Sequence, residues 1–234
     1  MDLKEEEILG DHASSHWYYA SKAAAMRAYL RKKSYRHVLD VGAGSGFFSK
    51  HLLERGIAER TTLVDTGYDR ERSETYHGRK VDYRTDYASA DFDLALFMDV
   101  LEHVPDPVAL LKHYLDIANP GTEVFVSVPA FKFLWSGHDD FLGHYRRYTT
   151  RSLRENLADA GLRIDNCTYY FGFVFPIAAA RRLLSRSKGT TGSDLKVHHP
   201  VTNAVLSAIC TAELPFVRLN GIAGLSVFGS ASKS

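Results

Sequence analysis

The stretch that decides the fold is Val38-Leu39-Asp40-Val41-Gly42-Ala43-Gly44-Ser45-Gly46, followed at once by the apolar-periodic segment Phe47 to Leu53. An aliphatic run, three alternating glycines and an apolar-periodic segment are typical of a strand, a tight turn and a helix. Glycines let the backbone approach a ligand closely, and the N-terminus of the following helix points its amides at that ligand. The stretch therefore predicts a site for a nucleotide-like ligand.

The spacing and the acid of this turn discriminate between nucleotide-like ligands. The glycines follow the pattern G-x-G-x-G, whereas dinucleotide sites use G-x-G-x-x-G, and Asp40 stands two residues before the first glycine. A carboxylate there would repel a pyrophosphate but favours a ligand with cationic centres. S-adenosylmethionine (SAM) carries an ammonium and a sulfonium and no phosphate, so it fits better than NAD. The alternative is a structural turn that binds nothing.

Length and composition limit the classes of protein. The chain has 234 residues, 45% hydrophobic and 24% charged, which is enough for one α/β domain over 1–234 and short for two. Its net charge of +1 and the lack of a basic stripe argue against a nucleic-acid partner. Residues 1–7 are acidic and lack the basic segment followed by an apolar segment that a signal peptide has, which predicts a cytoplasmic protein. No apolar run reaches the ~20 residues of a transmembrane helix.

Acidic residues also follow the next strands. Thr61 to Asp65 predicts a second strand, and in a doubly wound sheet Asp65 at its tip can bind the hydroxyls of a ribose. A solvated acid in a turn is the alternative. Asp82 and Asp86 are both candidates to contact the adenine amino group, and the sequence does not separate them. The apolar run Phe92 to Met98 is typical of a central strand buried on both faces.

Polar residues follow this central strand and fill a later loop. The strand ends in Asp99-Val100-Leu101-Glu102-His103-Val104, where open α/β sheets bind their ligands. The loop Trp135 to Tyr148 predicts the acceptor-binding segment, and its candidate substrate residues are His138, Asp139, Tyr145, Arg146 and Arg147. His144 or His103 is the candidate general base. His103 could instead satisfy backbone groups at the start of the next helix.

Several features of this second half leave alternatives open. The histidines and acids of the loop match no standard metal-ligand spacing, so we expect no metal. Arg146 and Arg147 could bind an anionic group of the substrate, or one of them could pair with a local acid. Thr150 or Ser152 is expected to cap the helix that follows the loop. Cys167 and Cys210 predict ordinary packing.

The two ends of the chain predict helical elements around a ligand-binding core at 38–172. Residues 1–34 are expected to form a helical segment whose patch Trp17-Tyr18 either closes over the ligand as a lid or anchors the helix. Residues 174–220 depart from the sheet pattern and predict a helical insertion before a last, antiparallel strand at 224–232. This insertion could form a lid, a dimer contact or a membrane-surface patch.

Taken together, the motifs resemble those of class I SAM-dependent methyltransferases over nearly the whole chain. The matching segments are Leu39 to Gly46, Asp65, Phe92 to Val104 and Asn119-Pro120-Gly121. A second set resembles a bacterial subgroup of the type 11, 12 and 23 methyltransferases: His16-Trp17, Val128-Pro129-Ala130, Leu134 to Asp139 and Gly143 to Thr149. The resemblance implies an α/β fold, a Rossmann-like three-layer sandwich with a seven-stranded, mostly parallel sheet whose last strand is antiparallel.

The resemblance also implies an activity and its partners. It implies methyl transfer from SAM, with S-adenosylhomocysteine as product, to oxygen or nitrogen of a small-molecule or lipid- or glycan-linked acceptor. Cofactor contacts are expected from Trp17, Asp40, Gly42, Ala43, Gly44, Gly46, Phe47, Asp65, Thr66, Asp82, Asp86, Asp99 and Val100. The alternatives are a SAM-binding protein without catalysis and a methyltransferase that acts on a peptide or protein. A monomer or a homodimer, with or without peripheral membrane contact, would fit.

Overall fold

The structure is a computed structural model that describes residues 15–185 and 198–234. Within these residues an eight-stranded sheet has the strand order β3-β4-β2-β1-β5-β6-β8-β7. The strands are β1 (Tyr35–Val41), β2 (Ala58–Val64), β3 (Arg72–Tyr76), β4 (Arg79–Arg84), β5 (Leu94–Met98), β6 (Glu123–Pro129), β7 (Leu162–Tyr170) and β8 (Ser226–Lys233). The helices are α2 (Trp17–Tyr29), α3 (Phe47–Glu54), α4 (Pro107–Leu115), α5 (Gly137–Leu142), α6 (Thr150–Asp159), α7 (Phe175–Ser185) and α8 (Pro200–Glu213), with short 3-10 turns η2 (Leu101–His103), η3 (Lys132–Leu134) and η5 (Leu214–Phe216).

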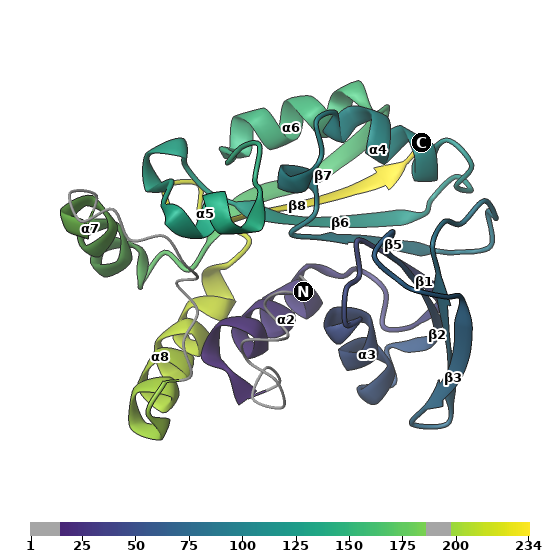
Figure 1. The fold of residues 1–234 in the computed structure, drawn as a ribbon, viewed down its shortest axis with the longest axis horizontal. Helices are drawn as coiled ribbons and strands as arrows, with labels where there is room; N and C mark the ends of the chain where they lie inside the picture. The colour runs from purple at the N-terminus through teal and green to yellow at the C-terminus, as the bar shows by residue number, and fades with distance from the viewer. Residues whose placement is uncertain (1–14, 186–197) are drawn as a thin grey trace.

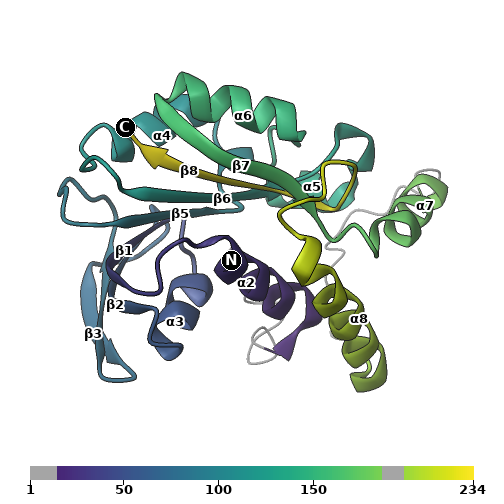
Figure 2. The same cartoon turned by 180° about the vertical axis from the view of Figure 1, so that it is seen from behind.

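Helices cover both faces of the sheet, with α4 and α6 on one face and α2 and α3 on the other (Figures 1 and 2). The central strand β5 shows the consequence, because all five of its residues are buried. Leu94, Leu96 and Met98 belong to the core on the α2 and α3 side, whereas Ala95 and Phe97 belong to the core on the α4 and α6 side. This confirms the three-layer α/β fold and the central strand buried on both faces.

The sheet has one strand more than the seven that the resemblance implies. The extra strand, β3, pairs antiparallel with β4 at the edge of the sheet. Its residues are exposed or half-buried, so the sequence carries no apolar alternation there. Cross-strand contacts stabilise it, including the Arg72 guanidinium 3.6 Å from the ring centroid of Tyr83 and a hydrogen bond from Ser73 to Asp82. The antiparallel β8, between β6 and β7, is confirmed.

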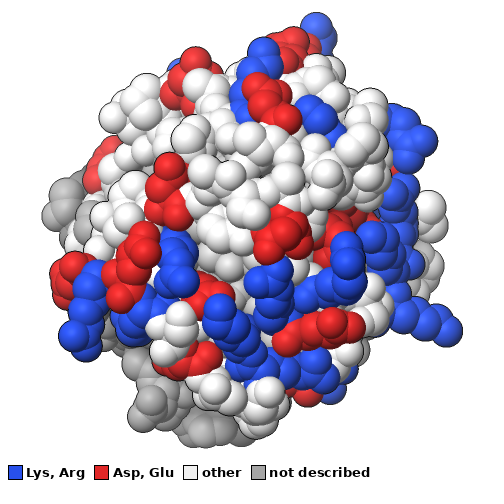
Figure 3. All heavy atoms as spheres, turned by 90° about the vertical axis from the view of Figure 1, so that its right-hand side faces the viewer, with Lys and Arg blue, Asp and Glu red and all other residues white. Residues whose placement is uncertain are grey.

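Charged side chains of both signs meet on the face that carries this edge. Basic and acidic residues are interspersed there in Figure 3. Several are paired, among them Lys50 with Glu74 at 3.4 Å and Lys80 with Asp82 at 2.8 Å. Partly exposed pairs such as Lys50 with Glu74 contribute little to stability, roughly 0–1 kcal/mol each, whereas Asp82 is buried. The mixed sign of the charges gives this face no basic stripe.

The register of the central strands brings the motifs of the sequence together. β1 runs parallel to β2 and to β5, with Val41 opposite both Val64 and Phe97. The residues that follow these three strands therefore leave the sheet at the same edge. They are the glycine turn, Asp65 and Asp99. The carboxyl edge of β2, β1 and β5 is thus the place to look for a ligand site.

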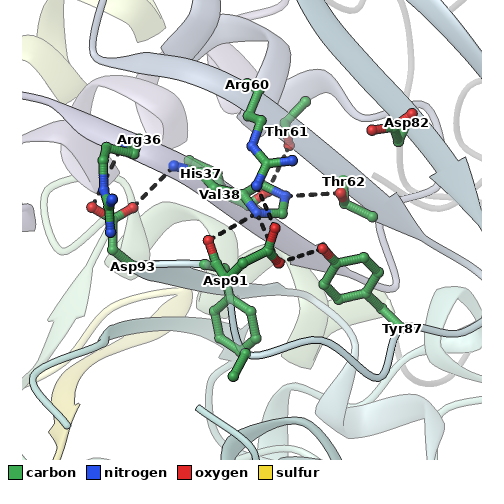
Figure 4. A network of polar contacts seen from close by, with 12 residues as sticks. Arg36, His37, Val38, Arg60, Thr61, Thr62, Asp82, Tyr87, Asp91 and Asp93 are labelled. Atoms are coloured by element: carbon green, nitrogen blue, oxygen red, sulfur yellow. Dashed lines mark hydrogen bonds and ion pairs between the residues drawn. The ribbon is translucent and has the colours of Figure 1, made fainter. Parts of the chain in front are cut away.

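A second polar cluster, at the amino-terminal side of the same strands, is structural. Figure 4 shows the buried His37 ring between Thr62, 2.8 Å from its Nε2, and the carbonyl oxygen of Asp91, 3.2 Å from its Nδ1. Arg60 and Tyr87 donate to the Asp91 carboxylate. Burial, together with Arg60, lowers the pKa of His37. Both ring nitrogens of His37 have partners in other segments, so the ring joins strands and has no nitrogen left for a ligand.

The N-terminal helix is joined to the helical insertion. The backbone N–H of Trp17 donates to Asn203 Oδ1 at 2.8 Å, and the Asn203 amide donates to the carbonyl oxygen of Ser15 at 2.9 Å. Helices α7 and α8 also expose apolar side chains, such as Ile177 at 75% and Val201 at 65%. The roles expected for the two helical segments stay predictions, and residues 1–14 and 186–197 of these segments lie outside the described residues.

Two further expectations concern membrane spans and cysteines. Among the described residues, no helix is long and apolar enough to cross a membrane. Cys167 and Cys210 are free thiols and both are buried, as packing residues are. Burial raises the pKa of each thiol to about 12.

The cap expected for the helix after the loop, Thr150 or Ser152, is wrong. Thr149 is the N-cap of α6, and its hydroxyl accepts a hydrogen bond from the backbone N–H of Ser152 at 3.2 Å. The Ser152 hydroxyl in turn accepts from the backbone N–H of Thr149 at 2.9 Å. The capping box thus joins Thr149 and Ser152, because the backbone of Thr149 is extended and Thr150 is already helical.

We expect Thr149→Ala to destabilise the protein by about 1 kcal/mol, since the backbone N–H of Ser152 loses the hydroxyl that accepts its hydrogen bond. Thr150→Ala, one residue inside the helix, should change the free energy of unfolding far less. Urea unfolding of the two variants and the parent protein measures the difference. Equal effects of the two substitutions would contradict the assignment of the cap.

Candidate functional site

Two neighbouring cavities open at the carboxyl edge of the described sheet. The first has a volume of about 320 Å³ and lies between the ends of β1, β2 and β5 and helix α4. Its lining residues are Val41, Gly42, Val64, Asp65, Thr66, Asp99, Val100, His103, Val104, Leu110 and Tyr114. The second, of about 180 Å³, is lined by His16, Trp17, Tyr18, Asp99, Glu102, His103, Pro129, His138, Leu142, His144, Arg147, Ala178, Arg182, His198 and Leu225. Asp99 and His103 line both cavities, so ligands in the two would meet there. We call them the glycine-side cavity and the histidine-side cavity.

The glycine turn needs glycine for two separate reasons. Gly42, Gly44 and Gly46 all have positive φ angles, of 66°, 52° and 72°. At Gly42 a Cβ atom would lie 2.3 Å from the Val100 side chain, and at Gly46 it would lie 2.4 Å from Leu63. The backbone conformation and the close approach of neighbouring strands both exclude a larger residue. The turn therefore holds the start of α3 against β2 and β5.

Asp65 ties the tip of β2 to this turn. Its Oδ2 accepts from the backbone N–H of Gly44 at 2.9 Å, and its Oδ1 accepts from the N–H of Gly67 at 2.9 Å. The side chain lines the glycine-side cavity together with Thr66. Because a carboxylate offers about four acceptor sites, two remain for hydroxyl groups of a ligand.

Asp40 lies beneath the turn and is 1% exposed. Its Oδ1 has no hydrogen-bond partner among the described residues. Burial raises the pKa of this carboxyl to about 6. A buried carboxyl oxygen without a partner is costly, and Asp40 is absent from the lining of both cavities.

The other expected cofactor residues are divided between several places. Val100 lines the glycine-side cavity, whereas Trp17 lines the histidine-side cavity. Asp82 lies within β4 and pairs with Lys80, away from both cavity linings. Asp86 accepts a hydrogen bond at 3.1 Å from Tyr114, which does line the glycine-side cavity. The geometry therefore favours Asp86 over Asp82 as the residue nearer to a ligand. Ala43 and Phe47 belong to the turn and to the first turn of α3, outside both linings.

A buried ion pair stands where the two cavities meet. The Lys22 ammonium on α2 lies 2.5 Å from Asp99 Oδ2 and 2.8 Å from the Tyr18 hydroxyl oxygen, and the Lys22 side chain is fully buried. Burial alone would lower the pKa of Lys22, but the charge and hydrogen bond of Asp99, with those of Tyr18, outweigh it and raise the pKa. Asp99 has a φ angle of 55°, a strained conformation for a residue with a side chain, which Lys22 and the Ser127 hydroxyl help to hold.

On the histidine side, Asp139 organises the loop. Its carboxylate accepts from Arg147 Nε at 2.6 Å and Nη2 at 2.9 Å, and it lies 2.8 Å from His144 Nδ1. Burial alone would raise the pKa of this carboxyl, but the hydrogen bonds from His144 and Arg147 lower it to well below its usual range. The His144 Nδ1 is thus occupied, which leaves Nε2 for the cavity.

The residues expected to bind a substrate therefore have different surroundings. His138 and Arg147 line the histidine-side cavity. Arg147 is the arginine that pairs with a local acid. Asp139 is completely buried and orients its neighbours. Arg146 donates to the carbonyl oxygens of Val104 and Pro105, and Tyr145 is 59% exposed, with neither in the cavity lining.

Both candidate bases line the histidine-side cavity. The rings of His103 and His144 meet edge to face with their centroids 4.6 Å apart. Beside them, Glu102 is 1% exposed. Burial, then the nearby charge of Asp99, raises the pKa of Glu102 well above its usual range. The site thus combines two imidazoles, a buried carboxyl and the Lys22–Asp99 pair.

Lys22 is one of the residues of this site that sequence reasoning missed. A lysine on an alanine-rich helix normally points to solvent, and nothing in the local pattern marks this one as buried. The available signal was the (i, i+4) spacing to Tyr18, which places both on one face of the helix.

We expect Lys22→Met to lower the free energy of unfolding by about 3 kcal/mol, because Asp99 loses the partner of its partly buried charge. Adding Asp99→Asn removes that charge, so the double variant should lose less than the sum of the single variants. Lys32→Met provides a control, since Lys32 pairs with Asp93 at 3.7 Å but is 46% exposed. Denaturant unfolding of Lys22→Met, Asp99→Asn, the double variant and Lys32→Met measures these losses. If the double variant loses as much as the two single variants together, the stabilising interaction between Lys22 and Asp99 is refuted.

Comparison with known proteins shows which family the chain resembles. The sequence profile of the methyltransferase domain family matches residues 15–166. A ubiquinone biosynthesis O-methyltransferase of Parvibaculum lavamentivorans is 30% identical over 153 residues, 56% of this chain and 60% of that protein. The enzyme of that name from Idiomarina loihiensis is 35% identical over 103 residues, 39% of this chain and 42% of that protein. The chain thus spans only part of the length of the curated relatives it matches.

Solved structures share the fold at low sequence identity. A SAM-dependent methyltransferase from Mesorhizobium loti superposes with a TM-score of 0.56 at 17% identity, covering 93% of this chain and 100% of that chain. One from Archaeoglobus fulgidus gives a TM-score of 0.56 at 17% identity, covering 99% and 98%. These likenesses concern the fold alone, and the family follows from the profile, which spans well over half of the chain. The chain belongs to the class I SAM-dependent methyltransferases.

Proposed function

We propose that this chain transfers a methyl group from SAM to an oxygen or nitrogen atom of a small-molecule or lipid- or glycan-linked acceptor. The observation that carries the proposal is the pair of cavities that share Asp99 and His103. A methyl donor in one cavity and an acceptor in the other would meet at their junction. Methyl transfer depends mainly on such alignment, because an in-line displacement needs little more than two reactants in the right geometry.

The glycine-side cavity offers acceptor groups that suit SAM. Asp65 retains acceptor sites for the ribose hydroxyls, and Gly42 places backbone in the cavity lining. Asp40 lies beneath the glycine turn, outside this lining, and its Oδ1 is without a partner among the described residues, so the charge of its carboxyl favours a ligand with an ammonium group nearby. When bound there, SAM supplies an electrophilic methyl group.

The histidine-side cavity suits an acceptor that must lose a proton. Asp139 holds His144 by its Nδ1, so the Nε2 atom and the neighbouring His103 can act on a hydroxyl or amine in the cavity. The aromatic rings of Trp17 and Tyr18 form another part of the lining and can cover an apolar portion of the acceptor. We infer that the two histidines are the groups that activate the acceptor atom.

Two further points bear on the acceptor. The curated relatives are named as O-methyltransferases, although they share only part of their length with this chain, which supports an acceptor whose oxygen atom attacks the methyl group. Charges of both signs alternate on the face shown in Figure 3, whereas nucleic-acid binding uses a basic stripe, which supports a small molecule over a nucleic acid.

Asp65→Ala should weaken SAM binding about 10- to 100-fold, because hydrogen bonds to a charged group contribute about 1.5–3 kcal/mol. Asp69→Ala is the matched control, since Asp69 is exposed four residues later and outside both cavity linings. Isothermal titration of each purified protein with SAM measures the affinities. If the folded parent protein fails to bind SAM, the proposed function is wrong at its first step.

His144→Ala should lower turnover by about 10²- to 10⁴-fold, the usual contribution of a positioned acid–base group, while leaving SAM affinity nearly unchanged. His113→Ala serves as control, because this histidine is 55% exposed and pairs with Asp86. The assay is release of S-adenosylhomocysteine with a panel of hydroxylated acceptors. Unchanged turnover in His144→Ala would remove this residue from the reaction.

A further inference from the structure

Three potential metal ligands converge in the histidine-side cavity. One atom each of Glu102, His103 and His144 lies within 4.8 Å of the other two. Glu102 and His103 come from η2, immediately after the central strand β5, and His144 follows α5. A set of two imidazoles and one carboxylate is typical of sites for divalent transition metals, and it leaves coordination positions open.

Glu102 supplies an independent sign that a cation belongs here. It is 1% exposed, and its Oε2 has no hydrogen-bond partner among the described residues. The two nearest acidic neighbours are already matched, Asp99 by Lys22 and Asp139 by Arg147. A buried carboxyl without such a match is costly unless a cation or a proton neutralises it. Because Glu102 lines the cavity, a metal ion there could reach it.

The orientation of His144 fits the same role. Histidine ligands of metals commonly place their second ring nitrogen against a carboxylate, which fixes the ring and raises its basicity. Here the Asp139 carboxylate lies 2.8 Å from His144 Nδ1 and is itself held by Arg147. The Nε2 atom is thereby directed to the cavity side, where the His103 ring stands edge to face with that of His144.

We propose that Glu102, His103 and His144 form a binding site for a divalent transition-metal ion in the acceptor cavity. The nitrogen ligands favour ions such as Zn²⁺, Co²⁺ or Fe²⁺ over Mg²⁺ and Ca²⁺. In this role, which rests on the proposed function, the ion binds the acceptor's hydroxyl in an open position and lowers the pKa of that hydroxyl, whose proton passes to water. The acceptor oxygen then forms its bond to the methyl carbon of SAM as the bond from that carbon to sulfur breaks and S-adenosylhomocysteine leaves. The acceptor is thus a hydroxylated compound, and the two histidines activate it as ligands of the metal instead of taking its proton themselves.

The sequence predicted no metal because the residues of the loop alone match no standard metal-ligand spacing. The three residues lie in two segments about forty positions apart, and only the packing of the loop against η2 brings them together. His138, which the loop pattern places beside His144, has its ring centroid 6.5 Å from that of His144 and stands outside the cluster.

The test is a titration of untagged, chelator-treated protein with Co²⁺, followed by the visible absorption of bound cobalt and by calorimetry. We expect the parent protein to bind one equivalent of Co²⁺, which Zn²⁺ displaces. Glu102→Gln and His103→Ala should each bind at least about tenfold more weakly, and Asp139→Asn, which removes only the orienting carboxylate, about 10- to 100-fold more weakly. The control His113→Ala should bind like the parent protein.

The outcomes separate this inference from the proposed function. SAM is titrated into the metal-free protein in the same series. If SAM binds but no stoichiometric Co²⁺ does, or if the ligand variants that remain folded by circular dichroism bind Co²⁺ like the parent, the metal site is refuted and the methyltransferase proposal stands. If Co²⁺ binds as expected and SAM does not, the proposed function fails while the metal site stands.

Discussion

The arrangement of the site depends on the buried ion pair between Lys22 and Asp99. Lys22 reaches from α2 to the residue that ends the central strand, and Asp99 stands at the junction of both cavities. A lysine that is completely buried persists only because its charge is matched at short range. The pair therefore couples the docking of the N-terminal helix to the shape of the junction. It also holds Asp99 in a backbone conformation that a residue with a side chain rarely adopts.

The charges around the junction fall into matched sets with one exception. Lys22 pairs with Asp99, and Arg147 pairs with Asp139, so two of the three acids at the junction have a cation of their own. Glu102 is the third, and it shares its surroundings with two imidazoles. The same low-dielectric surroundings that strengthen the matched pairs make an unmatched carboxyl costly. This contrast distinguishes the cavity from the His37 cluster at the opposite edge, where both ring nitrogens have partners (Figure 4).

Much of the fold could be predicted because its signals are local. The glycine turn, the doubly buried β5 and the antiparallel β8 each appear as a short pattern of residue types. The edge strand β3 could not be predicted in this way, since its residues are polar and its stability comes from cross-strand contacts with β4. The cap of α6 was misplaced because Thr149, Thr150 and Ser152 are all competent caps, and only the backbone decides between them.

The sequence by itself determined the ligand-binding edge. Strands that end in Asp40 and the glycines, in Asp65 and in Asp99 must finish together once the sheet is parallel, because the register of parallel strands brings their carboxyl ends to one edge. Only the tertiary structure decided what the other side chains do there. Lys22 is separated from Asp99 by 77 positions, and His144 from Glu102 by 42. Contacts at such separations arise from packing of α2 and the loop onto the sheet, which no local spacing records.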